Sequence, residues 1–232
     1  LRSAATDGFV ELVDLLLKKK KIELKESFAA RFLNAVDDEG NTPLFFAAQD
    51  GHAEVVEILL EQAEIDATKP NKKAWTPLRA ALNGDHAEAA ELLLDPGHGL
   101  GDADKSDTNW HPLGRASQGG HTHVVRLLLL DGTVKGNINR PDAEGNVPLY
   151  YAAVGNHLRV VKRLLDAGAG VDIISRGNIT PLYAAADAGH ARLVEYLLAK
   201  NAKVDIKTLE GVTPLEAAAK GGHAVVVDLL IS

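Results

Sequence analysis

Histidine is the residue type in this chain with the clearest potential for metal or acid–base chemistry. The sequence contains nine histidines and no cysteine, so a metal site would need histidine and carboxylate ligands. His121 and His123 are two residues apart on a predicted helix and point to different sides, and no nearby acid completes a zinc set. We therefore predict no metal site and no cofactor. Six histidines recur at one position of a repeated pattern, which favours a structural role in hydrogen-bonding backbone groups at a turn: His52, His86, His121, His157, His190 and His223.

Two further segments resemble functional motifs only in composition. Residues 95–102 are rich in glycine, but they follow a predicted helix and lack the Gly-Lys-Ser/Thr ending of a phosphate-binding loop. Residues 18–21 are four lysines, which suit either the cationic end of a helix or a nuclear-import patch. No serine, threonine or lysine stands in a recognisable nucleophile–base arrangement. We predict that the chain is not an enzyme.

The histidines belong to a repeated pair of predicted helices. Thr180 suits a helix N-cap and Pro181 the first helical position. A glycine break and His190 follow, and then a second helix with one apolar face. Neither helix can bury its apolar face alone, so the units must stack on copies of themselves. The unit starts every 33 to 36 residues, as TPLFFAA (42–48), TPLRAAL (76–82), HPLGRAS (111–117), VPLYYAA (147–153), TPLYAAA (180–186) and TPLEAAA (213–219).

This pattern resembles the ankyrin repeat family, and the resemblance covers essentially the whole chain. It implies an all-α solenoid of stacked helix-turn-helix units joined by projecting β-hairpin fingers. The residue two before each threonine position tolerates a tight turn in five of six repeats, whereas Ala74 leaves the turn type of its finger open. We predict a single domain, divided at 1–36 (a partial repeat with an insertion that adds a helical turn), 37–70, 71–105, 106–141, 142–174, 175–207 and 208–232 (a truncated last repeat).

One column of residues is the best candidate for binding. The residue immediately before each Thr-Pro lies on a finger, where burial does not dictate its type, and both tryptophans of the chain occur there. The resemblance places this column on a concave binding surface, together with finger residues before it and residues of the first helix. Tryptophan and arginine are the types most enriched at binding hot spots. The alternative is that the tryptophans pack on neighbouring fingers. The candidate residues are Asn41, Lys72, Lys73, Trp75, Asp107, Trp110, Arg115, Gln118, Asn146, Arg176 and Ile179.

Composition narrows the classes of partner. A net charge of −7 argues against a nucleic-acid binder, and no apolar run is long enough to cross a membrane. Residues 37–70 hold nine acids and one lysine, which suits either a solvated helix face or an acidic end that steers a basic partner. The chain starts at Leu1 and contains no methionine, so we expect it to be part of a longer protein. We expect an intracellular location, in the cytoplasm or the nucleus.

These observations predict a protein–protein interaction module that binds a protein or peptide on its finger and first-helix face. Two alternatives stay open. The chain could be a regulatory or substrate-recruiting segment of a larger enzyme, or a self-stacking spacer. The second alternative rests on the strongly apolar final helix, which would pair with another copy through Val225, Val226, Val227, Leu229, Leu230 and Ile231.

Overall fold

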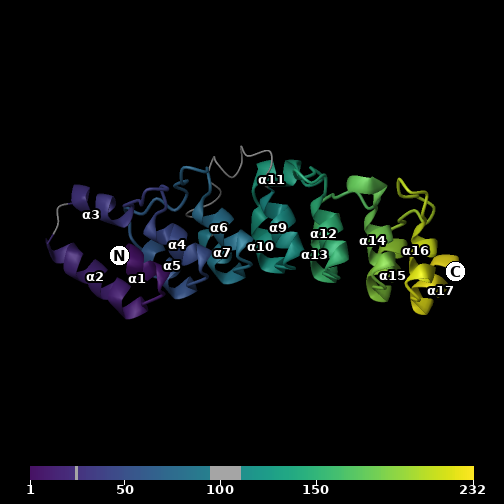
Figure 1. Cartoon of the computed structure of the whole chain (residues 1–232), viewed down its shortest axis with the longest axis horizontal. Helices are drawn as coiled ribbons and strands as arrows, with labels where there is room; N and C mark the ends of the chain where they lie inside the picture. The colour runs from purple at the N-terminus through teal and green to yellow at the C-terminus, as the bar shows by residue number, and fades with distance from the viewer. Residues whose placement is uncertain (24–25, 95–110) are drawn as a thin grey trace. The chain divides into compact units, whose positions relative to one another are not determined.

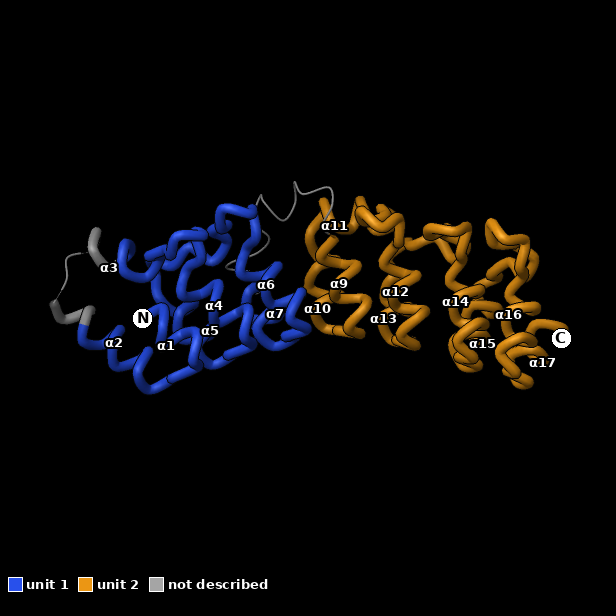
Figure 2. Tube along the Cα trace, viewed as in Figure 1, with its two compact units in different colours: residues 1–107 blue, residues 108–232 orange. Residues whose placement is uncertain are grey.

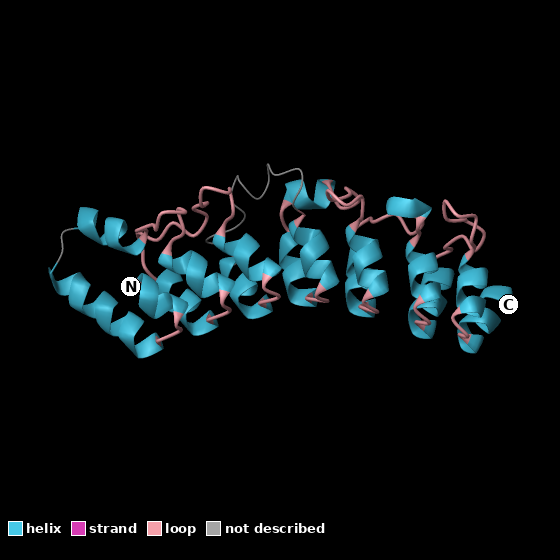
Figure 3. Ribbon diagram, viewed as in Figure 1, coloured by secondary structure: helices cyan, strands magenta, loops and turns pink. Residues whose placement is uncertain are grey.

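The computed structural model describes residues 1–23, 26–94 and 111–232, and nearly all of their regular structure is helical (Figures 1 and 3). The chain divides into two compact units, residues 1–107 and 108–232 (Figure 2). In each unit, helix pairs stack so that first helices pack on first helices and second helices on second helices. The predicted all-α class is confirmed, whereas the single continuous domain stays a prediction.

The first helices are short, and all but α1 begin at a proline: α1 (Arg2–Thr6), α4 (Pro43–Gln49) and α6 (Pro77–Asn83) in unit 1, and α9 (Pro112–Gln118), α12 (Pro148–Val154), α14 (Pro181–Asp187) and α16 (Pro214–Lys220) in unit 2. The second helices carry the larger apolar residues: α2 (Val10–Glu23), α5 (Ala53–Leu60) and α7 (Ala87–Leu93), then α10 (Thr122–Leu128), α13 (Leu158–Asp166), α15 (Ala191–Ala199) and α17 (Ala224–Ile231). Three further elements lie between the pairs: α3 (Glu26–Leu33) in the predicted insertion, α11 (Gly132–Gly136) and the 3-10 turn η1 (Arg176–Asn178).

The core of each repeat lies between its two helices and those of its neighbours. In the repeat of α14 and α15, Leu182, Ala185, Leu193, Val194 and Leu197 are all fully buried. Small alanines on α14 let the neighbouring first helices approach closely, and the leucines and valines of α15 fill the remaining space. Burial in each repeat therefore depends on the repeats beside it.

Threonine caps start most first helices as predicted. The Thr180 hydroxyl accepts a hydrogen bond from the Tyr183 backbone N–H at 3.1 Å, which satisfies one of the free donors of the first turn. Thr42, Thr76 and Thr213 make the equivalent bond at 3.1 to 3.2 Å. In α9 the ring of His111 replaces the threonine, and its Nδ1 accepts from the Gly114 N–H at 3.1 Å.

Val147, before α12, has no side-chain acceptor for this role. The Tyr150 N–H donates instead to the Val147 carbonyl oxygen at 3.1 Å, in the tighter 3-10 manner. Threonine has nearly the shape of valine, and its hydroxyl would reach Tyr150 as Thr180 reaches Tyr183. We expect Val147→Thr to raise the free energy of unfolding by about 0.5–1 kcal/mol, measured by urea denaturation. Thr180→Val is the matched control and should lower it; a loss of stability in Val147→Thr would contradict the prediction.

Four of the repeated histidines connect their repeat to the one before it. His157 Nε2 lies 2.9 Å from the Gln118 carbonyl oxygen, which ends the first helix of the preceding repeat. His52, His190 and His223 make the same contact with Thr6, Val154 and Asp187 at 2.9 to 3.0 Å. The predicted structural role is confirmed for these four, but the acceptor lies in the neighbouring repeat rather than in the histidine's own turn.

The fingers are tight turns, each closed by two backbone hydrogen bonds. In one finger the Asn71 N–H donates to the Trp75 carbonyl oxygen and the Ala74 N–H to the Asn71 carbonyl oxygen, both at 2.9 Å. Ser175 and Ile179 form an isolated antiparallel bridge, and no longer strand occurs in the described part of the chain. The ladder stops because the threonine that follows caps a helix and the proline after it has no N–H to donate. Ala74 has a φ of 60°, so its finger adopts the same left-handed turn that glycine takes at Gly40.

Candidate functional site

The predicted binding column lies at the base of the fingers in both units. Asn41 and Trp75 in unit 1 and Asn146 and Ile179 in unit 2 are all half-buried. Their backbone carbonyls close the finger turns, so the turn itself does not dictate the type of side chain. Asp107 and Trp110, which the sequence places in the same group, lie outside the described residues.

Trp75 packs against the first helix of its own repeat. The guanidinium carbon of Arg79, one helical turn further on, lies 5.0 Å from the centre of the indole ring, which is a cation–π contact. The Trp75 backbone N–H donates to Asn71 Oδ1 at 3.0 Å, which holds the residue at the base of the finger. Trp75 is thus partly packed and partly exposed. Its contact with Arg79 places a positive charge on the same first-helix face.

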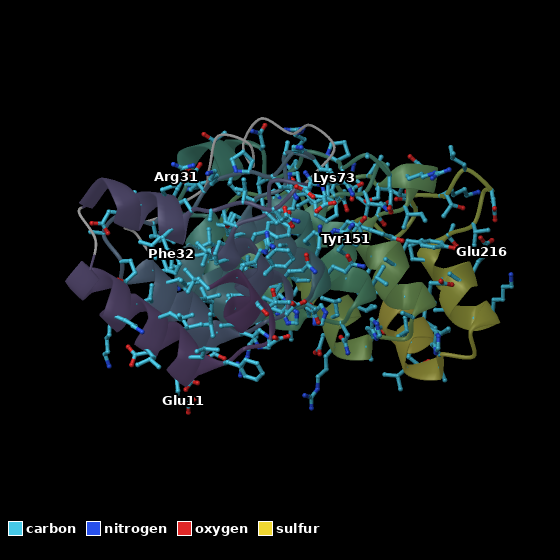
Figure 4. All side chains as sticks on the ribbon, turned by 60° about the vertical axis from the view of Figure 1, so that its left-hand side comes forward. Glu11, Arg31, Phe32, Lys73, Tyr151 and Glu216 are labelled. Atoms are coloured by element: carbon cyan, nitrogen blue, oxygen red, sulfur yellow. The ribbon has the colours of Figure 1, made fainter. Side chains whose placement is uncertain are left out.

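Two adjacent fingers of unit 1 are joined at their tips and at their bases. The Lys72 N–H donates to the Glu39 carbonyl oxygen at 2.9 Å, and Asn71 Nδ2 donates to Asn41 Oδ1 at 2.8 Å. The Asn41 side chain is therefore committed to holding the two fingers together. Lys72 and Lys73 are exposed and form no ion pair with a residue that the structure describes. The structure brings these candidates together with Trp75, and Figure 4 labels Lys73 at its finger.

In unit 2, Arg115 and Gln118 lie on the exposed side of α9. Arg115 Nη1 donates to Gln118 Oε1 at 3.1 Å, so the two side chains form one polar pair. Arg176 is exposed on the finger before α14, and its backbone N–H donates to the Gly145 carbonyl oxygen at 2.8 Å. This bond aligns the finger of Ile179 with the finger of Asn146.

Three tyrosines that the sequence analysis did not single out share the first-helix face of unit 2. Tyr150 and Tyr151 lie on α12 with ring centres 5.6 Å apart in an edge-to-face arrangement, and Tyr183 lies on α14. All three are half-buried. The sequence does indicate that two of them share a face, because Tyr150 and Tyr183 both follow the Pro-Leu pair of successive repeats.

Carboxylates surround two of these rings. The Tyr151 hydroxyl (Figure 4) donates to Asp142 Oδ2 at 2.6 Å and lies 3.4 Å from Glu144 Oε2. Burial and the hydrogen bond to Asp142 raise the pKa of Tyr151 to about 12. Burial also raises the pKa of Tyr183, with further contributions from the charges of Asp187 and Glu210. Both tyrosines therefore stay neutral and present a ring beside negative charge.

Other predicted features are exposed without a described partner. The acids of α5, Glu54 and Glu57, point to solvent and form no ion pair with a described residue. In α17, Val225 and Ile231 are exposed while Val226 is buried, so the predicted self-association surface is only partly presented. Self-association stays a prediction.

Among the described residues, no group of three or more histidines and acids could hold a metal. No helix in the same residues is long and apolar enough to cross a membrane.

The stacked helix pairs and the fingers between them define a class of protein, the helical repeat proteins with projecting finger turns. The sequence pattern of the family described as "Ankyrin repeats (3 copies)" matches residues 1–104, 79–176 and 171–232. The chain belongs to the ankyrin repeat family, as its Thr-Pro-Leu and Gly-His motifs predict.

One curated protein and one solved structure are similar to this chain. An ankyrin repeat-containing protein, C6C3.08 of Schizosaccharomyces pombe, is 39% identical over 51 residues, which is 22% of this chain and 22% of that protein. The chain thus matches about a fifth of the length of that relative. The crystal structure of the human ASB11 ankyrin repeat domain is similar with a TM-score of 0.74 and 23% identity, over 99% of this chain and 95% of that domain. This second likeness supports the fold alone.

Ankyrin repeats are generally protein–protein interaction modules and are typically not enzymes. Membership of the family therefore supports the predicted class of function. It leaves the binding face and the partner to be argued from the residues of this chain.

Proposed function

We propose that this chain binds a partner protein or peptide through its finger and first-helix face, with Trp75 as an anchor in unit 1. The observation that carries the proposal is the half-buried Trp75, whose backbone N–H donates to Asn71 and whose indole lies against the Arg79 guanidinium. A large side chain that is already ordered loses little conformational entropy when a partner covers it.

The positive charges beside Trp75 favour a partner with acidic side chains. Lys72 and Lys73 project beside Trp75 without a described acid to neutralise them. A partner that places an apolar side chain on the indole and an acidic one at the fingertip would satisfy both features. The lysines act mainly on the rate of association, since exposed charges steer encounters more than they add affinity.

The test compares Trp75→Ala with the unchanged chain in affinity capture from cell extract, followed by titration of each captured protein. We expect the affinity of the true partner to fall about tenfold or more, as for a hot-spot tryptophan worth about 2 kcal/mol. Thermal unfolding should change little, because the ring is only half-buried. Tyr196→Ala is the control, since Tyr196 lies on the second helix α15 between Lys162 and Lys200.

The outcomes separate binding from packing. A captured protein that is lost with Trp75→Ala and kept with Tyr196→Ala supports the proposal. A large fall in melting temperature with unchanged affinity would assign Trp75 to packing. Loss with Tyr196→Ala alone would place the binding surface on the second helices.

A further inference from the structure

The first-helix face of unit 2 differs in chemistry from the Trp75 surface of unit 1. Tyr150 and Tyr183 occupy the same repeat position on α12 and α14, which pack side by side. In unit 1 this position holds the buried Phe45 and the cationic Arg79. Half-exposed tyrosine rings on an otherwise polar face are typical of protein interfaces, because tyrosine offers apolar area together with a polar tip.

Three exposed acids and one exposed arginine lie around these rings, and none of the four forms an ion pair with a described residue. Glu144, Asp187 and Glu210 are exposed, and none forms an ion pair with a described residue. Arg176 is exposed on the intervening finger, and it too makes no ion pair with a described carboxylate. Asp142 is different, because its Oδ1 accepts from the backbone of its own finger and its Oδ2 from Tyr151.

We infer that this tyrosine face of unit 2, formed by Tyr150, Tyr151 and Tyr183, binds an arginine side chain of the partner. A guanidinium group stacks on an aromatic ring and can donate to a carboxylate at the same time. Tyr151 with Glu144, which lies 3.4 Å from its hydroxyl, offers that combination. Tyr183 with Asp187, one turn further on in α14, offers it too, and Glu210 is exposed on the following finger. Lysine fits less well, because its ammonium is a point charge that cannot match the planar fork of arginine.

The inference rests on the proposed function and deepens it, since it names a side chain that the partner presents to unit 2. The chain carries its own internal control. Of its four tyrosines, three lie on this face, whereas Tyr196 on α15 already has the Lys162 and Lys200 ammonium groups about its ring. A cation in solution should therefore approach Tyr151 and Tyr183 and avoid Tyr196.

The experiment is a titration of the whole chain, carrying isotope-labelled tyrosine, with a capped Gly-Arg-Gly peptide at physiological salt. Four ring signals report on the four tyrosines, and each is assigned with a Tyr→Phe variant. We expect the signals of Tyr151 and Tyr183 to shift and saturate while that of Tyr196 stays in place. A capped Gly-Lys-Gly peptide should bind several-fold more weakly.

Charge-neutral variants test the carboxylates without changing their shape. We expect the triple variant Glu144→Gln, Asp187→Asn, Glu210→Gln to bind the arginine peptide about tenfold more weakly, with an unchanged melting temperature. Glu54→Gln on α5 of unit 1 is the matched control and should bind as the original chain does. Equal shifts at all four tyrosines, or unchanged affinity in the triple variant, would overturn the inference.

Failure of this inference and failure of the proposed function give different results. A partner captured through Trp75 that binds the triple variant normally would refute the arginine site and leave the interaction function intact. If no captured protein depends on Trp75, the peptide titration still tests the tyrosine face by itself.

Discussion

Replacing Gly189 with alanine is expected to lower the free energy of unfolding by about 3 kcal/mol, as the sum of left-handed strain and overpacking. Gly189 has a φ of 72°, and an added Cβ would stand 2.5 Å from Nδ1 of His223. The ring cannot retreat freely, since its Nε2 lies 3.0 Å from the Asp187 carbonyl oxygen that it bonds. The added methyl group would therefore break the contact that joins two repeats.

Gly222→Ala is the matched control. It occupies the same repeat position with a φ of 71°, but an added Cβ there meets nothing within 4 Å. It should cost only the left-handed strain, about 1 kcal/mol. Urea denaturation of both variants measures the difference, and equal losses would show that the histidine contact does not matter.

A double-mutant cycle isolates the clash. His223→Ala removes the ring and its hydrogen bond, so Gly189→Ala in that background should cost little more than Gly222→Ala. Strict additivity of the two changes would contradict the geometry. The same close approach recurs between Gly51 and His86 and between Gly120 and His157, so the result bears on those junctions as well.

Acidification is expected to destabilise the repeat of α9 through His111. Burial lowers the pKa of His111 below its ordinary value of 6.5, and the charge of Arg140 lowers it further, while the Asn137 carbonyl and Asp142 oppose the shift. The capping Nδ1 accepts from the Gly114 N–H, which requires that nitrogen to be unprotonated. Protonation would therefore remove the cap as well as bury a charge.

The direction of the change in stability with pH depends on whether the folded or the unfolded chain binds the proton more tightly. Because the folded pKa is depressed, the unfolded chain takes up the proton first as the pH falls below about 6.5. The stability from His111 is present above that pH and is lost below it, by at most about 1.4 kcal/mol per pH unit. His111→Thr is the comparison, because threonine supplies the same cap at Thr42 and Thr180 without titrating.

Urea denaturation across this pH range gives the two stability profiles. We expect the His111→Thr chain to match the original above neutrality to within about 1 kcal/mol and to exceed it in acid. Parallel profiles would show that His111 does not titrate with unfolding. All other ionisable groups are common to both chains, so their contributions cancel in the difference.

Much of the fold follows from local chemistry that can be read in the residue order. A threonine cap acts on the N–H three residues ahead, and proline at the first helical position needs no partner, so Thr180 and Pro181 mark a helix start by their types alone. The period of these starts predicts stacking, because each helix pair leaves an apolar face uncovered. The Trp75–Arg79 contact is also local, four residues apart on one helix start.

The candidate site was less predictable, because several of its contacts join residues on neighbouring fingers. Asn41 has the composition of a binding residue, yet its side chain accepts from Asn71 of the next finger. The Lys72 N–H likewise donates to the Glu39 carbonyl oxygen of the preceding finger, and the Arg176 N–H donates to the Gly145 carbonyl oxygen of the finger before its own. Such pairs depend on how the fingers align, which no single repeat specifies.

The sequence by itself determined the family, the starts of most first helices and a structural role for the repeated histidines, because these follow from local caps and from the period of the motif. Only the tertiary structure decided which carbonyl four of the histidines bind, which finger residues stay exposed and which acid lies beside the Tyr151 hydroxyl. The physical reason is that stacking sets these distances. A column of side chains becomes a surface only when adjacent repeats hold it at a fixed spacing.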